Sequence, residues 1–261
     1  MSKSYKISHL YKKLIFNLKY KINLDNQKFN FDSLDESFNY YGTDKGTKVI
    51  NPYDKKSKSF IGHGFAEFYE HYLKNFQHKK TNILEIGTWK GSSVASFYHY
   101  FKNSRIFCLD RNYKFKFKSK RINFFYCDTR QEEDIKKFEK FLENKNCNSF
   151  DLIIDDGSHI FSDILKNFKN FFTKINSGGH YVIEDFNHSK YYPYLNDSEN
   201  KELNIENILK NLKSKKHFSS KHWSEEFQNF CFQNIEEIKI HKGKMIEDNI
   251  NISDIVFLKR K

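Results

Sequence analysis

Short apolar runs alternate with amphipathic segments along the chain from residue 81 onward. The apolar runs predict strands at 82–86, 105–109, 122–126, 150–155 and 178–183. Among the intervening helices, 159–174 has the clearest apolar face, and Ser177-Gly178-Gly179 is expected to end it. Alternating strands and helices predict a parallel sheet with helices on both faces. Two later strands, about 233–240 and 253–258, predict an antiparallel pair.

The residues before 78 follow a different pattern. They predict helices around one glycine-bearing loop, Tyr41 to Thr47, then a polar loop at 51–59 and a helix at 64–77. We therefore expect an N-terminal helical region, 1–77, and an α/β domain, 78–261. Within the α/β domain, the polar stretch 187–231 is rich in His, Lys and Asn and is expected to form a lid.

The charge of the chain is strongly positive, +12 over 261 residues, which at first suggests a polyanionic partner. Lys, Asn, Ile and Phe abound while only two Pro and two Ala occur, as expected for an AT-rich genome. Such a genome favours Lys as the cation, so the charge is weak support for a polyanion. We expect no nucleic-acid partner, and an anionic small substrate is at least as compatible with the charge.

The four cysteines are scattered, without a C-x-x-C pair or a metal-type spacing, which predicts reduced thiols and a cytoplasmic protein. We find no signal-peptide pattern and no run of about 18 apolar residues, so no transmembrane segment is expected. Residues 9–20 are basic and amphipathic. Such a segment packs on its own domain, on a second copy in a homo-oligomer, or on an anionic surface such as the inner membrane face.

The first strand of the α/β domain leads into a glycine turn. Ile83-Leu84-Glu85-Ile86 precedes Gly87 and Gly91, and apolar residues then recur at helical spacing. Because glycine has no Cβ, the backbone can turn sharply and approach a ligand closely. Strand, glycine turn and helix form the cofactor site of open parallel sheets, and a dinucleotide loop would read G-x-G-x-x-G. This E-x-G-x-x-x-G run instead resembles motif I of the class I S-adenosylmethionine (SAM) methyltransferases.

Acidic residues end the strands that follow. Asp110 ends the second strand, where a carboxylate can bind the ribose hydroxyls of either SAM or NAD. Strands four and five end in Asp155-Asp156 and Glu184-Asp185, and neighbouring strands lie about 4.8 Å apart. Carboxylates gathered this way repel one another and raise their own pKa values. A hard divalent cation such as Mg²⁺, which prefers oxygen ligands, would resolve the repulsion.

Three motifs together resemble a known family. They are Tyr-Gly-Thr-Asp-Lys-Gly at 41–46, Asp-Asp-Gly-Ser-His at 155–159, and Gly-Gly-x-Tyr-Val-Ile-Glu-Asp at 178–185. This set is similar to the macrolide-sugar O-methyltransferases of the mycinamicin and tylosin type and to related bacterial polysaccharide and sugar O-methyltransferases. The likeness spans about residues 40–186. It implies a Rossmann-like class I methyltransferase fold: a mostly parallel, doubly wound seven-stranded sheet with an antiparallel last strand, plus the N-terminal helical region.

The resemblance also implies roles for single residues. Asp156, Glu184 and Asp185 would bind Mg²⁺, and His159 would be the general base beside Asp155 and Asp156. Asp128 would lie near the adenine amino group, and the 41–45 loop, including Asp44, would cover the cofactor. The expected cofactor contacts are Glu85, Gly87, Thr88, Gly91, Ser92, Asp110, Arg111, Asp128, Asp155, Tyr41, Thr43, Lys45 and Tyr69. His63 and Gly64 belong to a further family-like segment.

The predicted activity is SAM-dependent O-methylation of a sugar hydroxyl, on a sugar nucleotide or a surface or capsular polysaccharide precursor. The metal would lower the pKa of the hydroxyl, and His159 would take its proton. A phosphoramidate or other phosphorylated glycan group is an alternative acceptor that the positive charge would suit. A nucleic-acid methyltransferase would use the basic surface, but its Asn-Pro-Pro-Tyr and Pro-Cys signatures are missing. A NAD-binding oxidoreductase or a non-catalytic cofactor-binding module is the third alternative.

Overall fold

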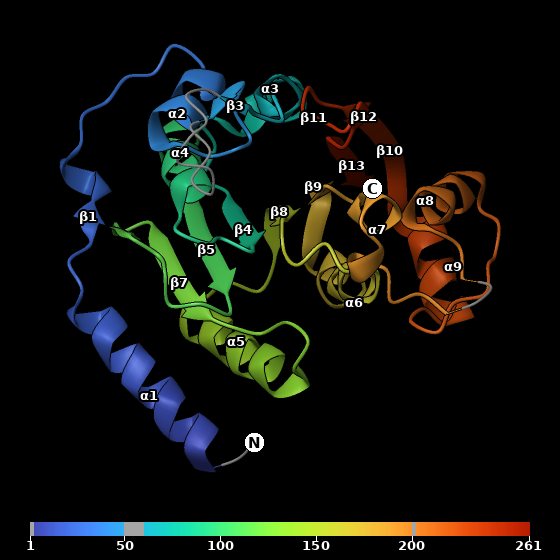
Figure 1. Cartoon of the computed structure of the whole chain (residues 1–261), viewed down its shortest axis with the longest axis horizontal. Helices are drawn as coiled ribbons and strands as arrows, with labels where there is room; N and C mark the ends of the chain where they lie inside the picture. Colours follow the sequence, from blue (N-terminus) through green and yellow to red (C-terminus); the bar gives the residue numbers. More distant parts are fainter. Residues whose placement is uncertain (1–2, 50–59, 200–201) are drawn as a thin grey trace.

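A seven-stranded sheet runs through the computed structural model, which describes residues 3–49, 60–199 and 202–261 (Figure 1). Its strand order is β10-β13-β9-β8-β4-β5-β7. The parallel strands are β4 (Asn82–Ile86), β5 (Arg105–Asp110), β7 (Ile122–Tyr126), β8 (Phe150–Asp155) and β9 (Ile175–Glu184), and β7 is at one edge of the sheet. The last strand, β13 (Asp254–Arg260), is antiparallel to β9 and to β10 (Ile235–Lys242), between which it lies. This confirms the predicted class I methyltransferase sheet and the predicted antiparallel pair.

Each central strand divides its side chains between two apolar layers. Along β5, Ile106 and Cys108 join one buried cluster while Phe107 and Leu109 join the other. This is the period of two expected for a strand covered on both faces. Helices α2 (Leu34–Tyr41), α3 (Ala66–Leu73) and α4 (Ser92–Tyr100) contribute to the first layer. The second layer is formed with α5 (Glu132–Asn144), α6 (Phe161–Phe171), α8 (Ile205–Ser214) and α9 (Glu225–Asn234).

The boundaries around α6 correct the sequence prediction. The helix begins at Phe161 instead of 159, because His159 has a left-handed φ of 56° and Ile160 is extended. It ends at Phe171 and passes through the 3₁₀ turn η3 (Phe172–Lys174) into β9. The predicted helix stop, Ser177-Gly178-Gly179, therefore lies inside β9, where the β8–β9 register shifts. Gly178 (φ 76°) supplies the left-handed conformation of this irregularity, which glycine adopts without steric cost.

The N-terminal region packs on the sheet instead of standing apart from it. Phe38 of α2 and Tyr69 of α3 are fully buried, and both rings contact Phe97 of α4. Helix α1 (Lys3–Leu18) contacts the body through Phe16, which lies against Tyr113 and Phe124. This region also contains two 3₁₀ turns, η1 (Leu24–Asn26) and η2 (Lys74–Phe76). Its strand β1 (Ile22–Asn23) pairs with β6 (Phe117–Lys118) of the α/β domain, and β2 (Lys48–Val49) pairs with β3 (Phe60–Ile61). The loop predicted at 51–59 lies outside the described residues.

The stretch predicted as a lid divides into two parts. Its second part packs in the core, because Trp223 stacks on Phe168 at 5.1 Å and donates to the carbonyl oxygen of Leu165 at 2.8 Å. Its first part, α7 (His188–Tyr191) and η4 (Pro193–Leu195), follows the end of β9 (Figure 1). A small hairpin, β11 (Ile246–Glu247) and β12 (Ile250–Asn251), fills the connection from β10 to β13. In the described ranges, no helix is both long and apolar enough to cross a membrane.

Candidate active site

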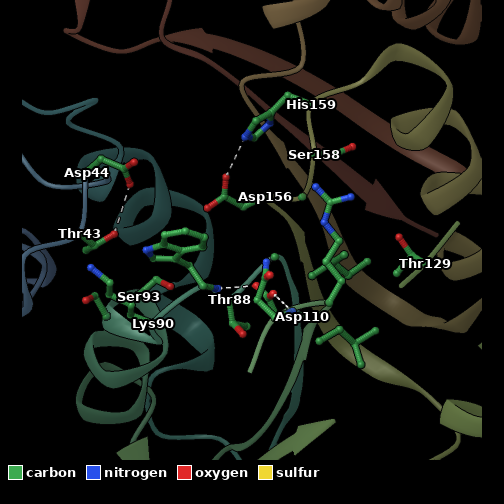
Figure 2. A pocket seen from close by; sticks show the side chains of 18 of the residues that line it. Thr43, Asp44, Thr88, Lys90, Ser93, Asp110, Thr129, Asp156, Ser158 and His159 are labelled. Carbon is green, nitrogen blue, oxygen red and sulfur yellow. Dashed lines mark hydrogen bonds and ion pairs between the residues drawn. The ribbon is translucent and has the colours of Figure 1, made fainter. Parts of the chain in front are cut away.

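A pocket of about 560 Å³ lies at the carboxyl ends of the central strands (Figure 2). One end, here called the glycine-turn end, is formed after β4, β5 and β7 by Gly87, Thr88, Trp89, Asp110, Arg111 and Asp128. The other, the histidine end, is formed after β8 and by three loops; its residues are Asp44, His63, Asp156, Ser158, His159 and Met245. Ligands of doubly wound sheets bind at this edge, and the volume is that of a small-molecule site.

The turn after β4 requires glycine at two positions, because neighbouring atoms leave no room for a Cβ. Gly87 has a φ of 88°, and a methyl group added to it would lie 1.9 Å from the carbonyl oxygen of Asp156. At Gly91, also with a φ of 88°, a methyl group would lie 2.5 Å from the ring of Phe115. Only glycine fits both positions, and at Gly87 the backbone borders the pocket without a side chain.

Asp110 is held rigidly at the end of β5. Its Oδ2 accepts from the backbone N–H of Trp89 at 2.7 Å, and its Oδ1 accepts from that of Asn112 at 2.6 Å. Burial raises the pKa of Asp110 above its ordinary value, although both hydrogen bonds act against that rise. Asp128, at the end of β7, pairs with Arg130 at 2.6 Å, and these hydrogen bonds lower its pKa. Both carboxylates therefore have fixed orientations at the glycine-turn end.

The predicted neighbours β8 and β9 do pair in parallel, which brings Asp156 and Glu184 together. The buried ammonium of Lys45 lies between them, in contact with Asp156 Oδ2 and 2.5 Å from Glu184 Oε2. The hydroxyl of Tyr69 donates to the other oxygen of Glu184. Burial alone would lower the pKa of Lys45, but the charges of Asp156 and Glu184 raise it well above its ordinary value. Lys45 is therefore a permanent cation inside the acidic cluster.

Asp185 and three imidazoles lie close together at the histidine end, although Asp185 and His188 do not line the pocket. Asp185 Oδ1 lies 3.4 Å from His63 Nδ1 and 3.5 Å from His188 Nε2, yet it is buried without a hydrogen bond from any described residue. His159 Nε2 lies 3.6 Å from Asp156 Oδ1, a contact that Figure 2 shows at the top of the pocket. Asp185 and His159 have φ values of 53° and 56°. Such conformations are sparsely populated by non-glycine residues and cluster at functional sites.

The pKa values of these groups follow from burial. Burial and the charge of Lys45 lower the pKa of His159 to about 4. Burial likewise lowers the pKa of His63 to about 4 and that of His188 to about 3. The pKa of Asp185 is raised well above its ordinary value by burial and by the charges of Asp156 and Glu184. At neutral pH the three imidazoles are neutral, so each has one unprotonated ring nitrogen.

Among the described residues, the group of possible metal ligands at the histidine end is not the predicted one, because of Asp156, Glu184 and Asp185 it includes only Asp185. Asp185 Oδ1 is a buried acceptor without a donor, and Asp156 Oδ1 remains free of Lys45. Ligand atoms of His159, Asp185 and His188 also lie within 4.8 Å of one another. Both oxygens of Glu184 already have partners, Tyr69 and Lys45, so Glu184 is the most constrained of the three predicted metal ligands.

The structure places about half of the expected cofactor contacts in the pocket: Thr43, Gly87, Thr88, Ser92, Asp110, Arg111 and Asp128. Gly91 does not border it and instead shapes the turn against Phe115. Lys45 and Tyr69 bind Glu184, as described above, and thus serve the acidic cluster. Their side chains come to the site from the N-terminal region, which spacing along the chain could not reveal.

Three further expected contacts do not line the pocket. The hydroxyl of Tyr41 donates to Gln27 Oε1 at 2.9 Å and lies 2.7 Å from His99 Nε2. Asp155 is buried, and its carboxylate accepts from Asn167 at 3.1 Å and from Tyr181 at 3.2 Å. Glu85 is fully buried and accepts from Ser93 Oγ at 2.6 Å. These contacts correct the expectation that the three side chains touch the cofactor, because each is already hydrogen-bonded to another residue of the protein.

Met245 and Asn112 line the pocket without having been expected there. Met245 lies in the β10–β13 connection, where its amide donates to Ser253 Oγ at 3.0 Å. Ser253 Oγ is also 2.7 Å from His63 Nδ1, which ties this connection to the histidine end. No sequence signal marks Met245, because an apolar residue in a polar connection has no characteristic spacing.

Comparison with known proteins defines the class. Residues 84–186 match the family model of a methyltransferase domain, Methyltransf_24. Residues 84–186 are thus similar to a methyltransferase domain, and the sheet described above has the class I methyltransferase fold.

Particular relatives are sugar O-methyltransferases by name. The mycinamicin VI 2''-O-methyltransferase of Micromonospora griseorubida is 28% identical over 130 residues, covering 47% of this chain and 31% of the relative. The 8-demethyl-8-(2-methoxy-alpha-L-rhamnosyl)-tetracenomycin-C 3'-O-methyltransferase of Streptomyces olivaceus is 30% identical over 132 residues, covering 48% and 33%. These similarities confirm the predicted resemblance. The chain spans about a third of the length of these curated relatives.

A solved structure of MycE from the mycinamycin biosynthetic pathway, in complex with Mg and SAH (S-adenosylhomocysteine), has the same fold. Its TM-score is 0.62 at 22% sequence identity, and the match covers 88% of this chain and 55% of that one. At this identity the likeness supports the fold, and it extends well beyond the matched methyltransferase domain.

Proposed function

We propose that this protein is a SAM-dependent O-methyltransferase that acts on a sugar hydroxyl, with an assisting divalent cation. The observation that carries the proposal is the continuity of one pocket from Asp110 to His159, through the glycine turn. A cofactor and a metal-assisted acceptor would thus share a single cavity. The sugar O-methyltransferase names of the relatives, and the Mg and SAH of the MycE complex, support the same assignment.

The glycine-turn end would hold the cofactor. Asp110, oriented by two backbone N–H groups, would accept hydrogen bonds from the ribose hydroxyls, and the bare backbone of Gly87 would allow close approach. Asp128 would face the adenine. SAM, when bound, supplies a methyl group on a sulfonium for an in-line displacement, so the chain's task is to position the acceptor oxygen.

The histidine end would hold the acceptor. Asp156 and Asp185 would bind a divalent cation through their free Oδ1 atoms, with Glu184 anchored beside them by Lys45 and Tyr69. A cation bound there would act as a Lewis acid on an acceptor hydroxyl. His159, neutral at pH 7, would accept the hydroxyl proton at Nε2, and Asp156 at 3.6 Å would stabilise the imidazolium.

We place the enzyme in the cytoplasm, acting on a precursor of a surface or capsular polysaccharide. The free cysteines Cys108, Cys127, Cys147 and Cys231 are all buried, which agrees with a reducing compartment. Leu10, Leu14 and Leu18 on α1 are each more than half exposed, with Lys12 and Lys13 beside them. This basic apolar stripe would suit a contact with an anionic membrane surface or with a second copy of the chain.

The test is methyl transfer from SAM to a panel of sugars, read as the mass gain of the acceptor. Asp156→Asn and Glu184→Gln should abolish turnover while calorimetry shows S-adenosylhomocysteine still bound. His159→Ala should lower the rate by about 10²- to 10⁴-fold, and a loss under tenfold would assign it a structural role.

EDTA should suppress turnover and Mg²⁺ restore it. Binding of NAD without binding of SAM would refute the proposal, and a salt-sensitive gel shift would revive a nucleic-acid substrate.

A further inference from the structure

His63 is a pocket residue without a role in the proposed reaction. It lines the histidine end and is buried. Its backbone N–H donates to the carbonyl oxygen of Asp44 at 2.7 Å, and its own carbonyl oxygen accepts from the N–H of Lys244 at 2.8 Å. Its ring stacks on that of Phe65 at 4.8 Å. The imidazole is therefore held in a fixed orientation between the 41–47 loop and the β10–β13 connection.

Ser253 decides which ring nitrogen of His63 carries the proton. Ser253 is fully buried, its Oγ accepts from the N–H of Met245 at 3.0 Å, and the same Oγ lies 2.7 Å from His63 Nδ1. This Oγ has no other hydrogen-bond partner among the described residues. A buried hydroxyl needs an acceptor for its own proton, and the lone pair of Nδ1 supplies one. His63 therefore accepts at Nδ1 and is protonated at Nε2.

The surroundings of Asp185 agree with this tautomer. Its Oδ1 lies 3.4 Å from His63 Nδ1, yet this oxygen is buried and receives no hydrogen bond from the described part of the chain. An N–H at Nδ1 would face that oxygen, whereas a bare Nδ1 accepts from Ser253 instead. Neither ring nitrogen can then bind a cation held by Asp185, because the lone pair of Nδ1 is used and a protonated Nε2 has none. The role of His63 is therefore the same with and without the cation.

The N–H at Nε2 is left for a ligand. Nε2 has no hydrogen-bond partner in the residues that the structure describes, and the ring lines the pocket. His159 lines the same end and, in the proposed function, accepts a proton at its own Nε2. The two imidazoles thus offer opposite groups to an acceptor, a donor on His63 and a lone pair on His159. A molecule with two hydroxyl groups can use both, because each hydroxyl is a donor and an acceptor.

We infer that His63 is an acceptor-binding residue, whose Nε2–H donates to a second hydroxyl oxygen of the acceptor, beside the hydroxyl that His159 deprotonates. Ser253 is its positioning residue, because it holds the proton on Nε2. The inference rests on the proposed function and adds two residues to the same site. A hydrogen bond to the second hydroxyl orients the first toward the methyl donor, so its loss lowers the rate as well as the binding of the acceptor.

The first experiment measures the tautomer and needs no acceptor. Histidine labelled with ¹⁵N is incorporated into the full chain, and the ring nitrogen resonances are recorded at neutral pH, with His63→Gln identifying those of His63. Nε2 should be protonated and Nδ1 bare. Ser253→Ala should increase the share of the form protonated at Nδ1, since Asp185 Oδ1 then becomes the partner of that nitrogen. A proton on Nδ1 in the unaltered protein, or no change on Ser253→Ala, would overturn the inference.

The second experiment uses an acceptor found in the sugar panel. His63→Phe keeps the stack on Phe65 but removes the donor, so kcat/KM for the acceptor should fall about tenfold, the value of one hydrogen bond, while S-adenosylhomocysteine still binds. His63→Gln can place an N–H near the position of Nε2 and should recover part of the loss. His180→Phe is the matched control, because His180 is also buried but does not line the pocket. Equal losses in His63→Phe and His180→Phe would assign His63 a structural role.

Deoxy analogues of the same acceptor locate the second hydroxyl. In the unaltered protein, one analogue that keeps the methylated hydroxyl should lose about tenfold in kcat/KM, and in His63→Phe the same analogue should react as well as the full acceptor. Losses that multiply for every analogue would show that His63 contacts none of the hydroxyls, which would overturn the inference alone. Methylation of no acceptor would count against the proposed function, and the tautomer would still be measured.

Discussion

Lys45 joins the N-terminal region to the acidic cluster. Its ammonium is 1% exposed and bound by Asp156 and Glu184, so it compensates two carboxylates that would otherwise repel each other. Breaking a buried ion pair from one side costs about 3–5 kcal/mol because the remaining charge has no partner. In this chain the remaining charges are also the proposed metal ligands.

We therefore predict that Lys45→Met lowers the free energy of unfolding by about 3–5 kcal/mol in EDTA. Millimolar Mg²⁺ should restore part of the loss, because a cation that binds only the folded state stabilises it. Lys242→Met is the control, since it also removes the partner of a buried carboxylate, Asp254, but outside the cluster. Chemical denaturation with and without Mg²⁺ measures the unfolding free energy of both variants. Equal Mg²⁺ effects on the two variants would contradict the prediction.

Glu85 is a fully buried carboxyl at the end of β4, and its Oε2 has no hydrogen bond from a described residue. Burial raises its pKa from 4.5 to about 7, although Lys45 and Ser93 act against this rise. The folded state therefore holds the proton more tightly than the unfolded state. Its contribution to stability is fully present below pH 4.5 and is lost as the pH rises through about 7.

Glu85→Gln should remove this dependence. The difference in unfolding free energy, variant minus wild type, should shift in favour of the variant by up to about 3 kcal/mol between pH 5 and pH 8. Other titrating groups are common to both proteins and cancel in the difference. Urea denaturation at a series of pH values gives the curve, and a difference that stays flat would show that Glu85 is ionised throughout.

At the scale of elements, the β4–α4 turn depends on its close approach to β8. Gly87→Ala would bring a methyl group 1.9 Å from the carbonyl oxygen of Asp156, so the turn or the end of β8 must move. A displacement of about 1 Å at a reacting centre can lower the rate about 10²-fold. We expect Gly87→Ala to lower kcat/KM by about 10²-fold and to weaken the binding of S-adenosylhomocysteine measured by calorimetry.

Gly178→Ala is the matched control for this change. Gly178 also has a positive φ, 76°, but nothing lies within 4 Å of an added methyl group. Its substitution should cost only the backbone strain, about 1–2 kcal/mol of stability, and leave cofactor binding unchanged. Similar losses of binding in both variants would show that backbone strain, and not contact with β8, sets the requirement for glycine at 87.

At the scale of the molecule, the layer of α6, α8 and α9 supports the sheet from the face opposite α2–α4. Trp223→Ala would remove the stack on Phe168 and the hydrogen bond to Leu165. We expect a loss of about 3–5 kcal/mol in unfolding free energy, as for other buried aromatic residues. Binding of S-adenosylhomocysteine should stay unchanged. Weaker binding would favour the predicted lid role for the second half of 187–231.

Parts of this architecture could be predicted because they depend on local patterns. Apolar runs located β4, β5, β7 and β8 within a residue, and parallel pairing requires that their carboxyl ends share one edge. The same rule predicts that the glycine turn, Asp110, Asp156 and His159 share one pocket, and the structure has them there. The helix stop at 177–179 was wrong because glycines in a strand irregularity resemble those that end a helix.

The sequence by itself thus determined the central strands and the carboxylates that follow them, since both are set by periodicity, while the resemblance of its motifs indicated the methyltransferase class. Only the tertiary structure decided that Lys45 neutralises Asp156, that Tyr41 turns toward His99, and that Ser253 hydrogen-bonds to His63. These contacts join segments that are distant along the chain. Their partners depend on how the N-terminal region and the β10–β13 connection pack around the pocket, which no local pattern specifies.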